Sequence, residues 1–435
     1  MMRSLVGLAF LLLLKGQCCL GCAVSEEQRP LVTYLLRKMI QSTSVPGALP
    51  NPSVLLALRL AWDHNLSTEQ RLLKILSQDA VDRVQNRKPF SSGQVALYAL
   101  AHQASCSDPR RVSAKGSVLD LVQLLGKKFE MELENIKIHG NPLTNYYQLG
   151  LCVLALCQLQ GSLSPSQAAD LFIPDEKKYN LAGQFSVDTA AVAVLAQICI
   201  QTTENAILPG VNKTITANVQ WLLKNILEQK SSDGVIGNMY STGEAMQALT
   251  VSNNYLTPGS WSCPLTLATV LAEIPKGTFD NPMAAAQIVP SLEGRTYLDV
   301  KTINCSKDRG NLTLITPPTI PSTSHHQSSQ LITVTYTVTD SVNNTFTDST
   351  RVSVPKGSVF LNVMEAAQAK DPKRFRFTYE QSSWGPYITS VRGLTADNNK
   401  RTYWQLLSGK TPLSKGAGEY VVSNGEKLVI KYTVY

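Results

Sequence analysis

The chain has 435 residues, of which 43% are hydrophobic and 17% charged, and its formal net charge is +8. This composition excludes an intrinsically disordered chain, and the length suits one large domain with a smaller one, or two to three average domains. The mild, scattered positive charge does not predict a nucleic-acid-binding protein; its densest cluster, 370–376, fits either a binding patch or a solvated strand edge.

The first 21 residues predict a secretory signal peptide. Arg3 precedes an apolar run, 5–14, that is too short to span a bilayer, and small residues follow at Gly16 and Gly21, after either of which cleavage is expected. No later stretch is apolar enough for a membrane span, so we expect a secreted, extracellular protein. Five sequons agree and mark candidate glycosylation sites: Asn65, Asn212, Asn304, Asn311 and Asn343.

Seven cysteines follow the signal peptide: Cys22, Cys106, Cys152, Cys157, Cys199, Cys263 and Cys305. An oxidising destination favours disulfides, and an odd number leaves one cysteine unpaired. Cys152 lies mid-helix in the apolar LGLCVLALC and is the natural candidate for a free, buried thiol. Neither the cysteines nor the five histidines show metal-ligand spacing, so we expect no metal site.

Two kinds of helical segment alternate six times over residues 22–306. Apolar segments that open with small polar residues begin at Asn51, Ser91, Thr144, Ser186, Gly237 and Phe279. The segments between them, such as LVTYLLRKMI and NKTITANVQWLLKNILEQ, are amphipathic. Because a helix that is apolar all round must be enclosed, we predict six buried helices ringed by six amphipathic ones. This arrangement is an (α/α)6 toroid, so the fold class is mainly α.

In such a toroid the inner helices run parallel, and their N-termini gather at one end, which we call the mouth. Small polar residues there can serve as helix N-caps, and capping alone accounts equally well for Ser53 and Ser91. Capping does not require the larger polar and aromatic groups at the same helix ends. Glutamine donates and accepts hydrogen bonds, and tyrosine offers a flat apolar face. The mouth therefore predicts a site for a large, neutral, amide-rich ligand.

The composition of the sequence changes after the segments of the predicted toroid. Residues 307–330 are rich in Pro, Ser and Thr and predict a linker. Residues 331–435 predict a small, β-rich α+β domain with a helix, VFLNVMEAAQA, capped by Ser358. Its expected strands are LITVTYTV, RVSVP, FRFTYEQ, PYITSVRGL, YWQLL, EYVVS and KLVIKYTV. Trp404 in YWQLL fits either a core position or a ligand contact.

The sequence contains few residue patterns that would indicate an enzyme. A toroid glycan hydrolase would need two carboxylates facing a cleft, and Asp188 and Glu244 each lie at an inner-helix head without a second local acid. No zinc-ligand set, phosphate-binding loop or nucleophile elbow is present. We therefore do not expect an enzyme and keep the hydrolase as an alternative.

Four segments, SVDTAA, TNYYQLGL, GNMYST and a late YWQLL, resemble the cobalamin carriers, the family of transcobalamin, intrinsic factor and haptocorrin. The resemblance covers nearly the whole mature chain. It implies an (α/α)6 N-terminal domain, a small C-terminal domain and a largely buried cobalamin between them, carried as a ligand and not as a catalytic cofactor. We expect a monomer, with a cell-surface uptake receptor as a candidate partner. A carrier-like protein that only docks partners is the remaining alternative.

The same resemblance implies a set of cobalamin contacts. Asp188 is expected to accept hydrogen bonds from corrin amides, and the C-terminal Trp-Gln-Leu is expected to close over the ligand. The full set is Gln94, Thr144, Asn145, Tyr146, Tyr147, Gln148, Ser186, Val187, Asp188, Thr189, Asn238, Ser241, Gln287, Trp404, Gln405 and Leu406. The implied disulfides are Cys22–Cys263, Cys106–Cys305 and Cys157–Cys199, with Cys152 free.

One position departs from part of the family. In the transcobalamin branch a histidine that can coordinate cobalt stands directly before Ser-Val-Asp-Thr. Here that position is Phe185, which cannot ligate a metal. We therefore expect no protein ligand to cobalt, and the assignment to one branch stays open.

Overall fold

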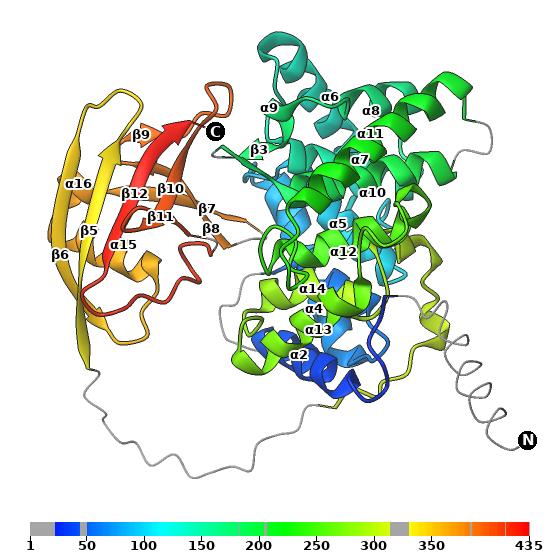
Figure 1. Cartoon of the computed structure of the whole chain (residues 1–435), viewed down its shortest axis with the longest axis horizontal. Helices are drawn as coiled ribbons and strands as arrows, with labels where there is room; N and C mark the ends of the chain where they lie inside the picture. The colour runs from blue at the N-terminus through cyan, green and yellow to red at the C-terminus, as the bar shows by residue number, and fades with distance from the viewer. Residues whose placement is uncertain are drawn as a thin grey trace, which may run out of the picture.

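The computed structural model describes residues 22–43, 50–181, 183–203, 207–313, 330–382, 385–413 and 415–434. The expected signal peptide and most of the expected linker lie outside the described residues. The described chain forms a helical N-terminal domain and a β-rich C-terminal domain, each with its own hydrophobic core (Figure 1). Within these ranges no helix has both the length and the apolar character that crossing a bilayer demands.

Six of the described helices form a closed inner ring. They are α3 (Pro52–Leu60), α5 (Ser92–Ala104), α7 (Tyr146–Gln158), α10 (Val187–Thr203), α12 (Ser241–Val251) and α14 (Pro282–Leu292). Each helix packs against the next, and α14 packs against α3, which closes the ring. These six inner helices are almost entirely buried; in α10, for example, every residue from Thr189 to Ile200 is buried. The predicted toroid is confirmed.

Amphipathic helices surround this ring. They are α2 (Arg29–Ser42), α4 (Leu66–Gln85), α6 (Leu121–His139), α8 (Pro165–Leu171), α11 (Pro209–Glu228) and α13 (Cys263–Glu273). In α2 the buried residues are Val32, Leu35, Leu36, Met39 and Ile40, the spacing of one helix face. The connections hold α9 (Glu176–Tyr179), β1 (Val112–Ala114), β2 (Ser117–Leu119), β3 (Asn180–Leu181), β4 (Gln184–Phe185), η1 (Asn253–Tyr255), η2 (Ile274–Lys276), η3 (Tyr297–Thr302) and η4 (Cys305–Lys307).

The polar heads of the inner helices do act as N-caps. The Asn145 side chain accepts a hydrogen bond from the Gln148 amide at 2.9 Å, and Asn281 accepts one from the Met283 amide at 2.7 Å. Asn51, Ser91 and Ser186 cap α3, α5 and α10 in the same way. In α12 the side chain of Asn238 accepts from the amides of Tyr240 and Ser241. Capping therefore explains why buried helices begin with small polar residues.

Three disulfides tie the N-terminal domain together. They are Cys22–Cys263, Cys106–Cys305 and Cys157–Cys199, the pairs that the family resemblance implied. Cys152 is free and buried in α7. Because the first two bridges join residues 241 and 199 positions apart, they fasten both ends of the domain to its body.

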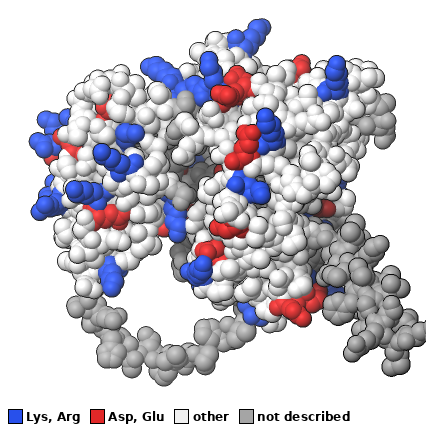
Figure 2. All heavy atoms as spheres, in the orientation of Figure 1, with Lys and Arg blue, Asp and Glu red and all other residues white. Residues whose placement is uncertain are grey.

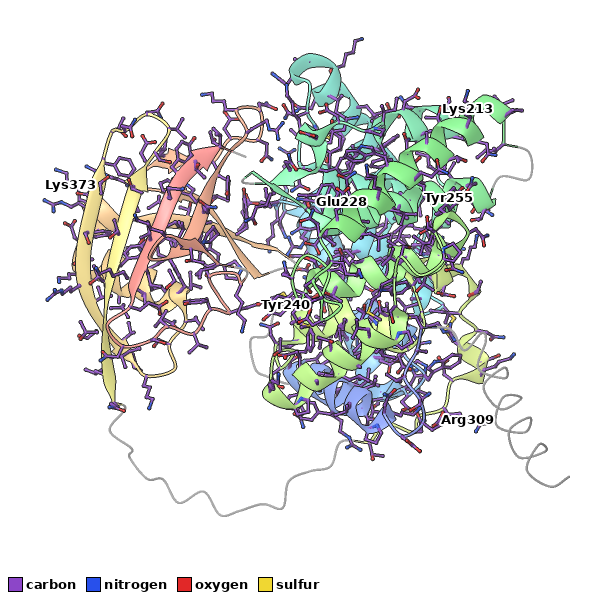
Figure 3. The ribbon with its side chains drawn as sticks, viewed as in Figure 1. Lys213, Glu228, Tyr240, Tyr255, Arg309 and Lys373 are labelled. Atoms are coloured by element: carbon purple, nitrogen blue, oxygen red, sulfur yellow. A yellow bond between two sulfur atoms is a disulfide. The ribbon has the colours of Figure 1, made fainter. Side chains whose placement is uncertain are left out.

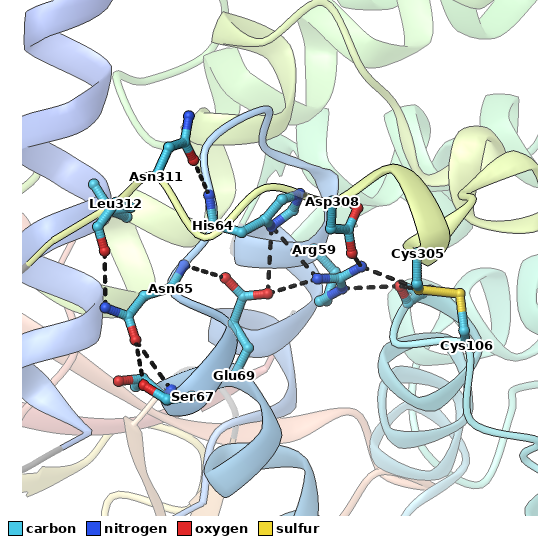
Figure 4. A network of polar contacts seen from close by, with 12 residues as sticks. Arg59, His64, Asn65, Ser67, Glu69, Cys106, Cys305, Asp308, Asn311 and Leu312 are labelled. Carbon is cyan, nitrogen blue, oxygen red and sulfur yellow. Dashed lines mark hydrogen bonds and ion pairs between the residues drawn. A yellow bond between two sulfur atoms is a disulfide. The ribbon is translucent and has the colours of Figure 1, made fainter.

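A buried polar network lies beside Cys106–Cys305, and we call it the clamp (Figure 4). The Arg59 guanidinium pairs with Glu69 at 2.6 Å and with Asp308. His64 lies 3.3 Å from Glu69, and its backbone amide donates to the Asn311 side chain. The clamp holds the segment that follows Cys305 against α3 and α4, so the chain leaves the N-terminal domain from a fixed point.

The C-terminal domain is built on a five-stranded sheet in the order β11–β10–β12–β5–β6, in which β12 and β5 run parallel and the other neighbours antiparallel. Its strands are β5 (Leu331–Asp340), β6 (Thr347–Pro355), β10 (Thr402–Ser408), β11 (Thr411–Pro412) and β12 (Lys427–Val434). A three-stranded sheet holds β7 (Phe377–Ser382), β8 (Gly385–Val391) and β9 (Leu394–Thr395). Helices α15 (Phe360–Lys370) and α16 (Pro372–Phe375) contribute to the core on one face of the larger sheet.

Two local predictions for this domain are wrong. EYVVS is not a strand: it forms only an isolated bridge between Val421 and Val359, because no neighbouring strand runs alongside it. Ser358 does not cap α15, since the N-cap is Val359, whose amide donates to the Asn362 side chain.

Candidate functional site

A cavity of about 310 Å³ lies between the two domains. One wall consists of the N-terminal ends of α10, α12 and α14, at the mouth of the toroid. The other wall comes from β8, β10 and residues 416–419 of the C-terminal domain. Figure 3 shows Tyr240, one of the lining residues, on the side of the toroid that faces the C-terminal domain.

The cavity brings together six of the predicted ligand contacts. Of these six, the four from the toroid are polar and the two from the C-terminal domain are largely apolar. The six residues are Asp188, Asn238, Ser241, Gln287, Trp404 and Leu406.

Asp188 is the charged group of the toroid wall. One of its carboxylate oxygens, Oδ2, accepts a hydrogen bond from the Ser241 hydroxyl at 3.0 Å. The other, Oδ1, is buried and has no hydrogen-bond partner among the described residues. Burial raises the pKa of Asp188 to about 6. A carboxylate oxygen that lacks a partner at a cavity wall can accept a hydrogen bond from a ligand amide.

Beneath the mouth, Tyr147 and Glu244 link two inner helices. The Tyr147 hydroxyl donates to Glu244 Oε1 at 2.8 Å, which joins α7 to α12. Glu244 is fully buried, and this burial, reinforced by the nearby charge of Asp188, raises its pKa well above the usual value. The raised pKa favours the neutral form of Glu244, which places no second negative charge beside Asp188. Tyr147 thus supports the mouth from below.

The remaining predicted contacts on α5 and α7 do not line the cavity. Gln94 completes a capping box with Ser91, and Thr144 is held by two hydrogen bonds to buried Glu132. Tyr146 is half-buried, with the Lys178 ammonium 5.6 Å from its ring centroid. Gln148 packs on Gly93, where a Cβ would lie only 2.8 Å from the Gln148 Cγ. These residues, with Asn145, form the neighbouring part of the mouth.

On α10, Ser186, Val187 and Thr189 surround Asp188 without lining the cavity. The Ser186 hydroxyl lies 2.8 Å from that of Thr189 and caps the helix. Val187 is buried against Gly237, which adopts a φ of 72° in the turn before α12. Any larger residue at this turn would collide with Val187, so the glycine sets the approach of α12 to α10.

Gln405 stands apart from its predicted partners. Side chains alternate along a strand, so it points to the opposite face of β10 from Trp404 and Leu406. It lines a separate hollow with Tyr403, Lys410 and Lys431. A Trp-Gln-Leu run on one strand cannot place all three side chains on one wall.

The structure adds residues to the site that sequence reasoning missed. From the C-terminal domain they are Pro386, Tyr387, Ile388, Gly416, Ala417 and Glu419, and from α14 they are Met283 and Ala284. The sequence signal available was the tyrosine in the predicted strand PYITSVRGL, since tyrosine combines a flat apolar face with a polar tip; its exposure, 46%, appears only in the structure. Burial raises the pKa of Glu419, which lies in a segment with no motif.

A short loop of the C-terminal domain bonds directly to the toroid, and we call this contact the latch. The Asn135 amide donates to Asn399 Oδ1 at 2.8 Å, and the Asn398 amide donates to the Leu143 carbonyl at 2.9 Å. Asn141 donates to the Asn398 carbonyl at 3.2 Å. Arg401, next in the same loop, donates to the Lys177 carbonyl at 2.8 Å. The latch joins the two domains without any contact through a ligand.

A model of the eukaryotic cobalamin-binding proteins matches residues 4–326. The chain belongs to this family. A domain of unknown function matches residues 357–434. The family resemblance drawn from the sequence is thereby confirmed.

Several relatives are similar to this protein over nearly the full length of both chains. Human transcobalamin-1 is 42% identical over 99% of this chain and 98% of its own length. Mouse cobalamin binding intrinsic factor is 36% identical over 95% of this chain and 94% of its own length. The crystal structure of haptocorrin in complex with Cbi is 40% identical, covers 95% of this chain and 99% of the haptocorrin chain, and has a TM-score of 0.77.

Phe185 lies just before Ser-Val-Asp-Thr, on β4, and packs within the toroid. Its ring centroid is 6.3 Å from that of Tyr179 and 6.3 Å from that of Trp221. The described residues gather no group of three His, Cys, Asp or Glu side chains of the kind that holds a metal ion.

Proposed function

We propose that this protein is a secreted carrier that binds cobalamin between its two domains and transports it. Membership of the cobalamin-binding family supports the ligand. The observation that carries the proposal is the cavity between the domains, where a wall with amide, hydroxyl and carboxylate groups faces a mostly apolar wall that also carries Tyr387 and Glu419. A corrin suits this pair of walls, because its rim carries many amides and its ring is a broad apolar surface.

In the proposed complex Asp188 is the principal acceptor. Its open Oδ1 receives an amide N–H of the corrin, while Ser241 keeps the carboxylate in place through Oδ2. Asn238, whose Oδ1 already accepts from two backbone amides at the start of α12, donates through Nδ2, and Gln287 can both donate to and accept from further side-chain amides. Trp404 and Leu406 cover the ring from the C-terminal domain. The other predicted contacts, from Gln94 through Thr189, belong to this proposal as residues around the cavity, whereas Gln405 faces away from it and is left out.

We also propose that no side chain ligates the cobalt. Phenylalanine has no lone pair, so Phe185 cannot do what a histidine at that position does. The cobalt is then expected to keep water or the ligand with which it arrived. The protein acts by enclosure and not by catalysis.

The direct test is uptake of aquacobalamin. The secreted protein is mixed with aquacobalamin, desalted on a sizing column, and the visible spectrum of the protein peak is recorded. About one corrin per chain with an aqua-type spectrum is the expected result. A nitrogen-ligated spectrum would keep the carrier function and refute the argument from Phe185. A colourless peak from a folded protein would reject the carrier and favour a partner-docking protein.

A glycan hydrolase is the second candidate, because Asp188 and Glu419 place two carboxyl groups on the cavity lining. Two carboxyls across a cleft are what glycoside hydrolysis uses. Asp188→Asn distinguishes the two functions. A hydrolase variant would still bind its glycan and lose turnover, whereas a carrier variant loses corrin affinity and has no turnover to lose.

A further inference from the structure

The C-terminal domain carries most of the net charge of the chain. Residues 331–435 hold 13 Lys and Arg against 8 Asp and Glu, so +5 of the total +8 lies in the last 105 residues. Figure 2 shows Lys and Arg side chains spread over this domain, with few Asp and Glu among them. Neither the cavity nor the latch accounts for this excess.

We call the face of the five-stranded sheet away from α15 the open face, and its β5 and β6 part is lined by hydroxyl groups. Along β5 the residues Ile332 to Val338 alternate, with the even-numbered side chains buried and the odd-numbered threonines pointing outward. Three hydrogen bonds join outward-facing threonines of β5 to hydroxyls of β6. They are Thr333–Ser353 at 3.2 Å, Thr337–Ser349 at 3.1 Å and Thr339–Thr347 at 2.8 Å.

Three cations stand among these hydroxyls at spacings set by the strand register. Lys427 and Arg351 both lie opposite Thr335, on either side of it, so their Cα atoms are about 10 Å apart across two strand spacings. Lys431 lies four residues further along β12, about 13 Å from Lys427. Lys410, in the turn after β10, lines the adjoining hollow with Lys431.

These cations have no acidic partner among the described residues. No outward-facing position of β5, β6, β10 or β12 is Asp or Glu. Acids of this domain are used elsewhere: Asp340 accepts from the amides of the following turn, and Asp348 pairs with Arg392. The open face is therefore a positive surface with no internal neutralisation.

We propose that the open face binds a sulfated polysaccharide. A linear chain with repeated sulfates can contact cations about 10–13 Å apart together, which a single small anion cannot do. Serine and threonine hydroxyls next to the cations can donate to sulfate oxygens. The hydroxyls of this face lie along β5 and β6, and its apolar side chains are scattered: Leu331 is exposed at one end, and Val429 and Leu407 lie nearer β10 and are at least partly buried. They do not form the broad exposed apolar face that inserts into a membrane interface. The proposal is independent of the cobalamin site, which lies on the other side of β10.

The test uses heparin as the probe. The full-length protein and the triple variant Arg351→Gln/Lys427→Gln/Lys431→Gln are compared by equilibrium binding at several salt concentrations. A matched control, Lys74→Gln/Lys127→Gln/Lys213→Gln, removes the same charge from exposed positions of the toroid. We expect the open-face variant to bind heparin at least about tenfold more weakly at 0.15 M salt and with a shallower salt dependence, because it has lost three ionic contacts. The control should stay within about twofold of the parent protein.

Three outcomes would overturn the proposal. The parent protein does not bind heparin at 0.15 M salt; both triple variants lose the same affinity, so that net charge alone is responsible; or desulfated heparin or phosphatidylserine vesicles bind as well as heparin. Equal melting temperatures of the two variants exclude misfolding as the cause of any loss.

Discussion

Asp188, the proposed acceptor for corrin amides, illustrates how a residue kept for binding can lower the stability of the free protein. Its carboxylate is buried with only one of its two oxygens hydrogen-bonded within the described chain. An acid whose pKa is higher in the folded state than in the unfolded state binds its proton more tightly when folded. Folding therefore loses stability as the pH rises from the unfolded pKa of 3.8 through about 6, and the full penalty applies above that window.

Asp188→Asn should accordingly stabilise the unliganded protein at neutral pH. A shift from 3.8 to about 6 corresponds to about 3 kcal/mol in the free energy of unfolding. We expect a gain of this order at pH 7.5 and almost none below about pH 4, measured by urea unfolding at both pH values. Asp280→Asn, at an exposed position, is the control. The same gain at both pH values would show that the effect does not come from titration of Asp188.

Phe185 allows a spectroscopic test at the residue scale. Phe185→His introduces an imidazole directly before Ser-Val-Asp-Thr, where it can replace the water on the cobalt of aquacobalamin. We expect the visible spectrum of the bound corrin to shift toward a nitrogen-ligated form in this variant only. Phe185→Ala, which opens the same space without a ligand, should keep the aqua-type spectrum; a shift there would point to some other nitrogen.

At the scale of elements, the latch loop between β9 and β10 is expected to slow ligand release. A neutral hydrogen bond contributes about 1 kcal/mol, so Asn398→Ala/Asn399→Ala should weaken closure by about 2 kcal/mol. The cobalamin dissociation rate should then rise roughly 10- to 30-fold, with little change in the association rate, as followed by exchange with labelled ligand. Lys400→Ala in the same loop, whose ion pair is within the loop, is the control. An unchanged dissociation rate would show that the latch does not hold the closed state.

The clamp is expected to contribute strongly to the stability of the N-terminal domain. Arg59→Leu leaves Glu69 and Asp308 buried without their cation. Breaking a buried ion pair on one side typically costs about 3–5 kcal/mol, so we expect a clearly lower melting temperature. Arg309→Leu, an exposed change in the same segment, should have almost no effect. Thermal unfolding of both variants, with the disulfides intact, measures the difference; equal melting temperatures would contradict a stabilising clamp.

At the scale of the whole molecule, we expect ligand enclosure to require both domains on one chain. The clamp and the linker that follows keep the C-terminal domain close to the mouth, which gives it a high effective concentration there. A chain ending at Gln330 retains Asp188, Asn238, Ser241 and Gln287 but loses Trp404 and Leu406. We expect it to bind cobalamin at least about 100-fold more weakly than the full chain in a competition assay. Equal affinity would show that the toroid alone encloses the ligand.

Much of the toroid could be predicted because its determinants are local. The six apolar runs each contain their own N-cap, as Asn145 and Ser186 show, and burial all round follows from composition within one helix. The outer helices are predicted from the single apolar face that each of their sequences contains. Even Phe185 could be placed, because it directly precedes a recognisable segment. Each of these features depends on residues within a few positions of one another.

What tertiary structure decided is which distant groups meet. Asp188 and Ser241 are 53 positions apart, and Tyr147 and Glu244 are 97 positions apart, yet each pair is hydrogen-bonded. Tyr387 and Glu419 enter the cavity only because β8 and the 416–419 segment face the mouth. EYVVS has the aromatic and β-branched residues of a strand but forms only an isolated bridge to Val359. Side-chain periodicity is a property of one segment, whereas pairing, docking and shared burial depend on segments that only the folded chain brings together.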